Sequence, residues 1–219
     1  MYIGHYAVSI AFKEKYKQIP LWLLFVAVQF LDLLAFVLII FGIERIHYTG
    51  NQNPFYRTAI EYLPYSHSLL FATIFALVTF LAFWKFKNKI WGMILAMGLL
   101  SHWFIDFLFQ KSNLPLFLNQ YKVGLGLWDF PLFSYSIEII LVAIAGYYLY
   151  KNKNIKINRL LFLILIMFAF FTFIIFVPEP LIMQTSPRLK SFIILLAYLV
   201  FTFIAFLAER KVNNNVIIK

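Results

Sequence analysis

Residues 90–109 read IWGMILAMGLLSHWFIDFLF, an apolar stretch with a single acidic residue. A transmembrane helix needs about 20 predominantly apolar residues, because the hydrocarbon core of a bilayer is about 30 Å thick. Five further stretches have this length or come close to it: residues 20–42, 66–84, 132–150, 160–177 and 191–208. We therefore predict an all-α fold, a polytopic integral membrane bundle of about six transmembrane helices.

The composition of the whole chain agrees with this prediction. Of its 219 residues, 63% are hydrophobic and 13% are charged, whereas soluble domains have about 45–50% apolar and about 25% charged residues. Six spans use roughly 120 residues, which leaves no room for a separate soluble domain. We expect one integral membrane domain over residues 1–219, in which residues 1–150 hold a site and residues 151–219 add two apolar helices.

The apolar segment 1–12 precedes these stretches and is too short to cross a bilayer. Lys13, Glu14 and Lys15 end it, so we expect a short N-terminal half-helix or an interfacial helix. The segment lacks the signal-peptide order of a basic start, an apolar centre and a small-residue cleavage site, so we expect it to stay on the chain.

Lysine and arginine residues are distributed unequally between the two sides of this six-helix arrangement. Thirteen of the 19 lie on one side, mostly in short loops, and six lie on the other. The positive-inside rule then places both termini in the cytoplasm and the longer loops 43–65, 110–131 and 178–190 outside. We attribute the net charge of +10 to topology, and we expect no nucleic-acid partner. The absence of cysteine excludes disulfides and thiolate metal sites.

Several ionisable side chains lie inside or at the edge of the predicted spans, where each costs a few kcal/mol and indicates a functional site. They are Asp32 in the first span, His67 in the second, His102 and Asp106 one helical turn apart in the third, and Glu138 in the fourth. At 1.5 Å per residue from the basic flanks, all five lie about 18–27 Å from the cytoplasmic side, in the outer half of the bilayer. We therefore expect them to converge.

Imidazole nitrogens and carboxylate oxygens are ligands that zinc takes, and catalytic zinc sites keep a position for water. We therefore predict a divalent metal, zinc in the first place, which would make its bound water a nucleophile near neutral pH. The opposing interpretations are a His102–Asp106 pair that joins two helices, a protonated Asp32 bonded to Gln29, and an interfacial His67. Glu138 could be a ligand, and we favour a general base or a residue that holds a histidine.

Four motifs carry a resemblance to a known family: MYIGH at 1–5, QFLDLL at 29–34, PYSHSL at 64–69 and SHWFID at 101–106. In their order and spacing over roughly residues 1–140, they resemble bacterial inner-membrane proteins described as membrane-bound metal-dependent hydrolases. The resemblance implies the metal ligands His5, Asp32, His67, His102 and Asp106. By depth alone His5 is the weaker member, because it lies only about 12 Å from the cytoplasmic side.

Two later features bear on the same resemblance. The run GLGLW at 124–128 and the following Glu138 are similar to a subgroup of these proteins. In contrast, Gln110 stands where the family pattern has a histidine ahead of the Leu-Pro-Leu run at 114–116. Because an amide is a poor metal ligand, this departure puts a second metal position in doubt.

These observations predict a hydrolase of the bacterial inner membrane that uses metal-activated water on an ester or phosphoester. Its partners would be the lipid bilayer and a lipid-like small-molecule substrate. One alternative is a proton- or cation-coupled transporter, which broken helices in two matching halves would favour; the sequence shows no such pair. The other is a non-catalytic membrane scaffold.

Two further expectations concern the rest of the chain. Glu44 and Glu61, with the basic residues near them in loop 43–65, are expected to form a solvated cluster. The last two predicted helices contain no ionisable residue between 160 and 177 or between 191 and 208. We expect these helices to serve packing or oligomer formation.

Overall fold

The computed structural model describes residues 2–151, 157–176 and 186–210, and within these ranges it contains eight α-helices and two short antiparallel β-hairpins. The helices are α1 (His5–Lys15), α2 (Leu21–Val28), α3 (Phe30–Ile40), α4 (Leu69–Phe86), α5 (Lys89–Phe109), α6 (Pro131–Lys151), α7 (Ile157–Phe176) and α9 (Pro187–Arg210). The hairpins pair β1 (Arg45–Tyr48) with β2 (Thr58–Tyr62), and β3 (Leu114–Phe117) with β4 (Gln120–Val123). Two 3-10 turns, Pro54–Tyr56 and Leu127–Asp129, complete the connections.

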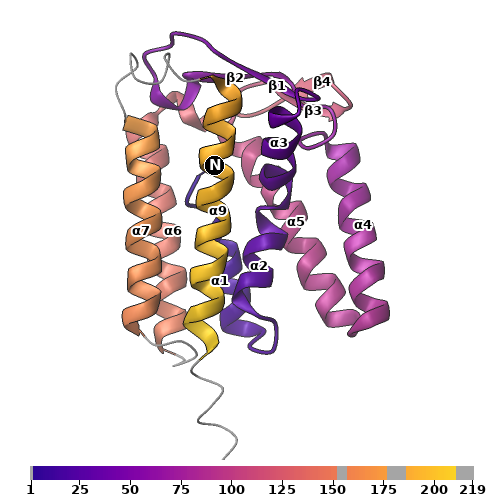
Figure 1. The fold of residues 1–219 in the computed structure, drawn as a ribbon, viewed down its shortest axis with the longest axis vertical. Coiled ribbons are helices and arrows are strands. Elements are labelled where there is room, and N and C mark those ends of the chain that lie inside the picture. The colour runs from indigo at the N-terminus through magenta and orange to yellow at the C-terminus, as the bar shows by residue number, and fades with distance from the viewer. Residues whose placement is uncertain (1, 152–156, 177–185, 211–219) are drawn as a thin grey trace, which may run out of the picture.

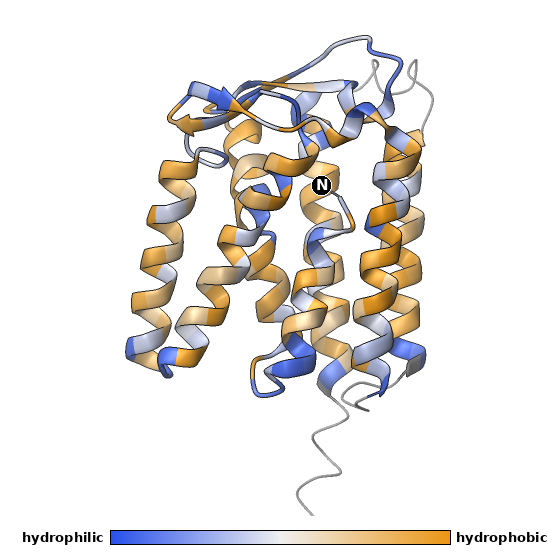
Figure 2. Cartoon of the chain, turned by 180° about the vertical axis from the view of Figure 1, so that it is seen from behind, coloured by the Kyte–Doolittle hydropathy of each residue, from blue (hydrophilic) through white to orange (hydrophobic). Residues whose placement is uncertain are grey.

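The long helices stand side by side, and both hairpins lie at the same end of the bundle (Figure 1). Five helices in the described part of the chain are long and apolar enough to cross a membrane, and the bent pair α2 and α3 makes a sixth span if it is counted as one. Apolar residues cover the helices between the two ends, whereas polar residues gather at the hairpins and at the opposite turns (Figure 2). The predicted all-α membrane bundle is confirmed.

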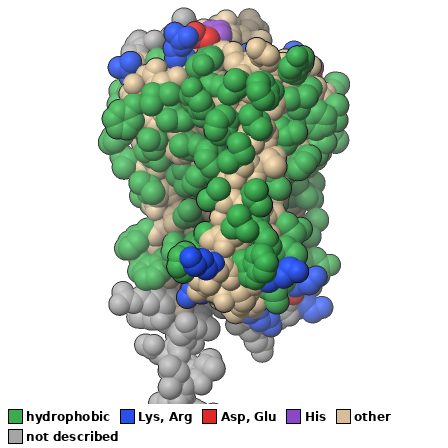
Figure 3. Space-filling model, turned by 90° about the vertical axis from the view of Figure 1, so that its right-hand side faces the viewer, with side chains coloured by type: hydrophobic (Ala, Val, Ile, Leu, Met, Phe, Trp, Pro, Cys, Tyr) green, Lys and Arg blue, Asp and Glu red, His purple; other side chains and the backbone are tan. Residues whose placement is uncertain are grey.

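The outer surface has the character expected of a multi-pass membrane protein. Hydrophobic side chains cover the face between the two ends of the molecule (Figure 3). Lysine and arginine side chains gather at the two ends. Helix α4 belongs to this lipid-facing surface, because only Ala72 and Ala76 of its side chains are buried. It packs against α5 so closely that a methyl group on Gly92 would lie 2.5 Å from the carbonyl oxygen of Phe80.

The first predicted span, residues 20–42, is not one helix. The chain bends by 59° between α2 and α3, and the bend is centred on the buried Gln29, whose ψ of 8° departs from the helical value of about −42°. The carbonyl of Val28, immediately before the bend, accepts a hydrogen bond of 2.8 Å from His102 Nδ1. A tertiary contact therefore occupies a backbone group at the break, as a non-helical turn at membrane depth requires.

Helix α1 is a half-length helix, as predicted, but it lies inside the bundle and not at an interface. His5, Tyr6 and Ile10 are fully buried, and α1 packs against α2, α5 and α6. Ser9 donates a hydrogen bond to the carbonyl of Leu24, and Lys13 at its far end pairs with Glu209 of α9 at 2.5 Å. The start of α1 lies part-way along the bundle (Figure 1). The ring of His5 stacks on that of His102, so His5 lies level with His102, although counting from Lys13 places it nearer the cytoplasmic side.

Part of the predicted topology falls on residues that the structure does not describe. Most of the predicted loop 178–190 lies outside the described residues, as does the end of the fifth predicted span at Val177. The same holds for four of the basic residues counted for orientation: Lys153, Lys156, Lys211 and Lys219.

Candidate metal centre

All five predicted ligands meet in the interior of the bundle. Asp32 comes from the first turn of α3, and His67 from the turn before α4. His102 and Asp106 lie one turn apart on α5, and His5 opens α1. Four of these side chains are almost fully buried and Asp32 is partly buried. Two overlapping sets of three, His5–His102–Asp106 and Asp32–His67–His102, have ligand atoms within 4.8 Å of one another.

The imidazole nitrogens and carboxylate oxygens of four of the five side chains lie close to one another. His67 Nε2 lies 3.3 Å from Asp32 Oδ1 and 3.7 Å from Asp106 Oδ2. His102 Nε2 lies 3.5 Å from each of these same two oxygens. Tetrahedral zinc with bonds of about 2.0–2.2 Å separates neighbouring ligand atoms by about 3.3–3.6 Å. Three of the four nitrogen–oxygen separations lie in this range and the fourth, at 3.7 Å, lies just beyond it. These separations and the donor set of two imidazoles and two carboxylates suit a zinc-sized cation.

Hydrogen bonds on the far side of each imidazole determine which ring nitrogen carries the proton. His102 Nδ1 is 2.8 Å from the carbonyl of Val28, which can only accept, so Nδ1 must donate. His67 Nδ1 is 2.9 Å from Ser66 Oγ, and that hydroxyl already donates to Glu44 Oε2 at 2.6 Å. Ser66 must therefore accept from His67. With Nδ1 protonated, a ring that is neutral has its Nε2 lone pair directed to the cluster.

The Nε2 atoms of His67 and His102 thus face carboxylate oxygens of Asp32 and Asp106. His102 Nε2 is buried and has no hydrogen-bond partner within the described parts of the chain. Such a group is costly to bury unless something satisfies it. A divalent cation satisfies all four atoms together, and its charge of +2 balances two aspartates beside two neutral histidines.

Neighbouring side chains hold the two aspartates. Tyr198 of α9 donates a hydrogen bond of 3.0 Å to Asp32 Oδ2, and Gln110 donates one of 3.0 Å to Asp106 Oδ2. The amide of Gln110 therefore contacts a candidate ligand, although it departs from the family pattern. From the sequence we expect the site within residues 1–150, and we expect α9 to serve packing or oligomer formation. Tyr198 of α9 nevertheless contacts the candidate ligand Asp32. The sequence signal for Tyr198 is absent, because a tyrosine in an apolar span is unremarkable.

His5 lies beside the four-atom set. Its Nε2 is 3.1 Å from Asp106 Oδ1, the carboxylate oxygen that faces away from His67 and His102. Its ring stacks on that of His102, with centroids 3.8 Å apart and planes 4° from parallel. Asp106 therefore connects His5 to the cluster, and His5 is placed to orient Asp106 by a hydrogen bond.

Glu138 does not lie among the candidate ligands. Its Oε2 accepts hydrogen bonds from the backbone N–H groups of Tyr2 (2.9 Å) and Gly4 (3.0 Å), immediately before α1. The carboxylate of α6 thus fixes the chain that carries His5. These bonds are to the backbone that precedes His5 and not to an imidazole ring, so the predicted roles of Glu138 stay predictions.

The expected solvated cluster in loop 43–65 is wrong for Glu44. Its side chain is buried and accepts hydrogen bonds of 2.9 Å from the backbone N–H groups of Tyr65 and Ser66, besides the bond from Ser66 Oγ. A buried carboxylate needs such partners. Glu61 is exposed as expected, and it lies 3.5 Å from Arg45 Nε in a surface ion pair.

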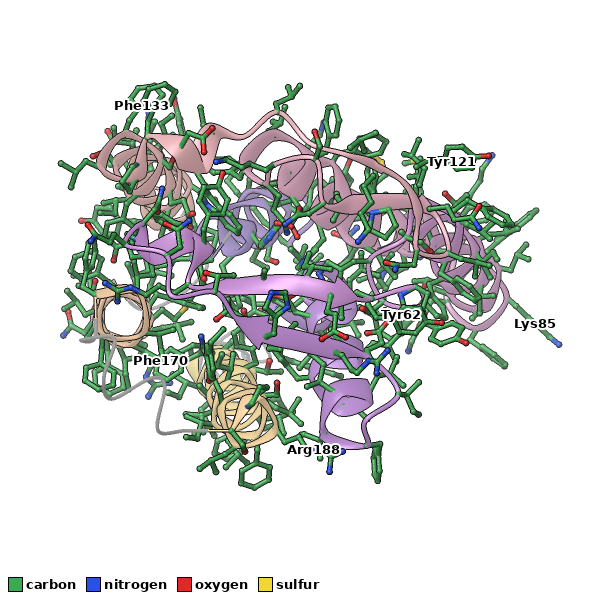
Figure 4. The ribbon with its side chains drawn as sticks, turned by 90° about the horizontal axis from the view of Figure 1, so that it is seen from above. Tyr62, Lys85, Tyr121, Phe133, Phe170 and Arg188 are labelled. Carbon is green, nitrogen blue, oxygen red and sulfur yellow. The ribbon has the colours of Figure 1, made fainter. Side chains whose placement is uncertain are left out.

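A cavity of about 140 Å³ adjoins the cluster. Asp32, His67 and Asp106 line its inner end, so the candidate ligands are open to whatever the cavity holds. Much of the remaining wall is apolar; it includes Ala35, Phe36, Ile39, Phe55, Ile60, Leu63, Phe170, Phe171, Ile174 and Ile194. Residues of β1 and β2 close its outer end, and this hairpin lies across the middle of the bundle, with Tyr62 at one end of β2 (Figure 4).

The neighbouring basic side chain at this outer end, Lys111, is paired. Its amine lies 2.8 Å from Asp129 Oδ1 and 4.6 Å from the ring centroid of Tyr56. The hydrogen bond from Lys111 holds the pKa of the Asp129 carboxyl below its ordinary value. Both charged groups are largely exposed, so this pair forms part of the rim and adds little to stability.

No family model, no curated protein and no solved structure matches the chain. The resemblance to membrane-bound metal-dependent hydrolases therefore stays a prediction from the motifs.

Proposed function

We propose that the protein is a membrane-embedded hydrolase that depends on a divalent cation, zinc in the first place. The single observation that carries the proposal is the convergence of two Nε2 atoms, from His67 and His102, on carboxylate oxygens of Asp32 and Asp106 at 3.3–3.7 Å. When bound, the cation would supply Lewis-acid activation of water and of the scissile group.

The residues around the cluster support hydrolysis over mere helix pairing. Three of the ligands line a cavity, whereas a contact that only joins helices has no need of open space beside it. Tyr198 and Gln110 hold the aspartates in place, which keeps the ligand set preorganised. The apolar wall would take the hydrocarbon part of an amphipathic ester or phosphoester and exclude bulk water.

The distribution of basic residues supports a site near the outer face of a bacterial inner membrane, with both termini in the cytoplasm. The chain has no cysteine, so a single introduced thiol tests this orientation. The Lys122→Cys variant, changed on the exposed strand β4, should react with a membrane-impermeant maleimide applied to intact cells. Labelling only after lysis would reverse the orientation.

Hydrolysis itself is tested with purified protein on acyl p-nitrophenyl esters and alkyl p-nitrophenyl phosphates. Protein stripped with a chelator should be inactive and should regain activity with Zn²⁺. Asp32→Asn should lower the rate at least about 100-fold, because it removes one charged ligand. Asp129→Asn makes the same chemical change on the rim and should keep the activity of the wild type.

The outcomes separate the proposal from its alternatives. Turnover that survives both chelation and Asp32→Asn would contradict metal-dependent hydrolysis. Cation uptake into proteoliposomes without turnover would support a carrier instead. The bend between α2 and α3 is the feature a carrier would use, but the described helices contain only one such broken pair and no matching partner.

A further inference from the structure

The outer end of the cavity carries a positive charge that the cation cluster does not use. Lys190, in the first turns of α9, lines the cavity together with its neighbour Ser191. This inference rests on the proposed function, because it concerns the substrate of the same site.

Within the described ranges, no carboxylate forms an ion pair with Lys190. Its amine donates a hydrogen bond of 2.7 Å to Thr58 Oγ1 and lies 5.3 Å from the ring centroid of Tyr48. Arg57 adds a second positive charge that acts on it. Lys111 on the rim differs, because Asp129 neutralises it. A partly buried cation that lines an apolar cavity attracts an anion.

Ser191 supplies an independent sign of a ligand at the same place. Its side chain is 0% exposed, and its hydroxyl has no hydrogen-bond partner in the part of the chain that the structure describes. Buried hydroxyl groups are almost always paired. An unpaired one that lines a cavity beside a lysine is placed to donate a hydrogen bond to a bound oxygen.

The helix fixes the separation between this charge and the candidate metal centre. Tyr198, which bonds Asp32, lies eight residues after Lys190 on α9, or about 12 Å along the helix axis. Ile194 of α9 and Phe36 and Ile39 of α3 line the cavity between the two levels. A molecule that reaches both ends must therefore carry two polar groups with an apolar part between or beside them.

We propose that Lys190 and Ser191 bind a phosphate group of the substrate. This phosphate group lies apart from the bond that is cleaved. The substrate class is then an anionic amphiphile, such as a phospholipid-like ester, with its scissile bond at the cluster. A cation bound by two aspartates and two neutral histidines has no net charge, so charge selection comes from Lys190. The volume of about 140 Å³ suits the polar part of such a molecule and not its whole length, because pockets for drug-sized ligands measure about 300–1,000 Å³.

The test is binding of short amphiphiles to the full chain in neutral detergent. Hexyl phosphate, hexanol and inorganic phosphate are titrated separately, and the fluorescence of Trp128, which lines the cavity, reports occupancy; Trp128→Phe identifies its signal. Each titration is made with chelator-stripped and with Zn²⁺-loaded protein. Hexyl phosphate should bind at least about tenfold more tightly than hexanol, because hexanol cannot form the charge-assisted hydrogen bond to Lys190. It should also bind at least about tenfold more tightly than inorganic phosphate, because inorganic phosphate has no apolar chain to contact the cavity wall.

Variants of the lysine decide the assignment. Lys190→Met should remove most of the preference for hexyl phosphate in both metal states, and Lys190→Arg should keep it. Ser191→Ala should weaken the binding of hexyl phosphate and leave the binding of hexanol unchanged. Lys122→Met removes the same charge from an exposed position and should change nothing.

Two results would overturn the inference. One is hexyl phosphate binding that Lys190→Met leaves unchanged, including binding that depends only on the metal. The other is equal binding of inorganic phosphate, which would indicate a site for free phosphate. Because the binding measurement needs no turnover, a failure of hydrolysis leaves it intact, and a failure here leaves the metal-dependent hydrolase untouched.

Discussion

Ser66 is the residue that sets the state of the candidate ligand His67. Its hydroxyl donates to Glu44 and accepts from His67 Nδ1, so the His67 Nε2 lone pair is directed to the cluster. Ser66→Ala should therefore weaken zinc binding about 10- to 100-fold, the usual effect of losing a group that orients a ligand histidine. Competition with a chelating dye measures the change.

Another serine provides the control for this prediction. Ser136 is exposed on α6 and bonds only its own helix, at the carbonyl of Leu132, so Ser136→Ala should bind zinc like the wild type. If Ser66→Ala also keeps the affinity of the wild type while remaining folded, the tautomer argument for His67 fails.

For single residues, the sequence predicts the ionisable side chains that are costly to bury in a membrane. It predicts few of the residues that form hydrogen bonds with them. His67, His102 and the two aspartates stand out because ionisable side chains are rare in apolar spans. Glu44 bonds Ser66 across 22 residues and Tyr198 bonds Asp32 across 166. Neither separation has a local pattern, so both partners emerge only from the tertiary structure.

The break between α2 and α3 shows the same limit for an element. Residues 21–40 contain no proline or glycine, the usual causes of a sharp kink, and the run has the length of one span. The bend at Gln29 coincides with a hydrogen bond from His102, 74 residues away. The length and type of the other helices follow from local composition, and they agree with the prediction.

Gly92 permits the close packing of α4 and α5. A methyl group there would lie 2.5 Å from the Phe80 carbonyl and 3.1 Å from the Trp84 backbone nitrogen, and backbone atoms cannot rotate away. Gly92→Ala should therefore destabilise the protein by about 1–3 kcal/mol, the typical cost of overpacking. A lower Tm in detergent measures it.

Gly146→Ala, on α6, is the matched comparison for Gly92→Ala. Its methyl group would meet only Cδ1 of Ile164 at 3.1 Å, the end of a flexible side chain, so its Tm should fall less. An equal Tm for Gly92→Ala and the wild type would show that α4 and α5 can separate without cost.

The whole molecule is a bundle whose interior polar groups come from distant parts of the chain. Helices α1, α3, α5 and α9 and the turn before α4 each contribute a side chain to one place. Three of the four histidines are gathered there, and the fourth, His47, is exposed on β1. A bound cation should consequently stabilise the entire fold and not one element.

The metal content of the purified protein tests the central claim most directly. After incubation with excess Zn²⁺ and gel filtration, mass spectrometric analysis should find one zinc per chain in the wild type and in His47→Ala. His102→Ala and Asp32→Asn should each lose it. A wild-type protein that retains no zinc, or variants that retain as much as the wild type, would contradict the account.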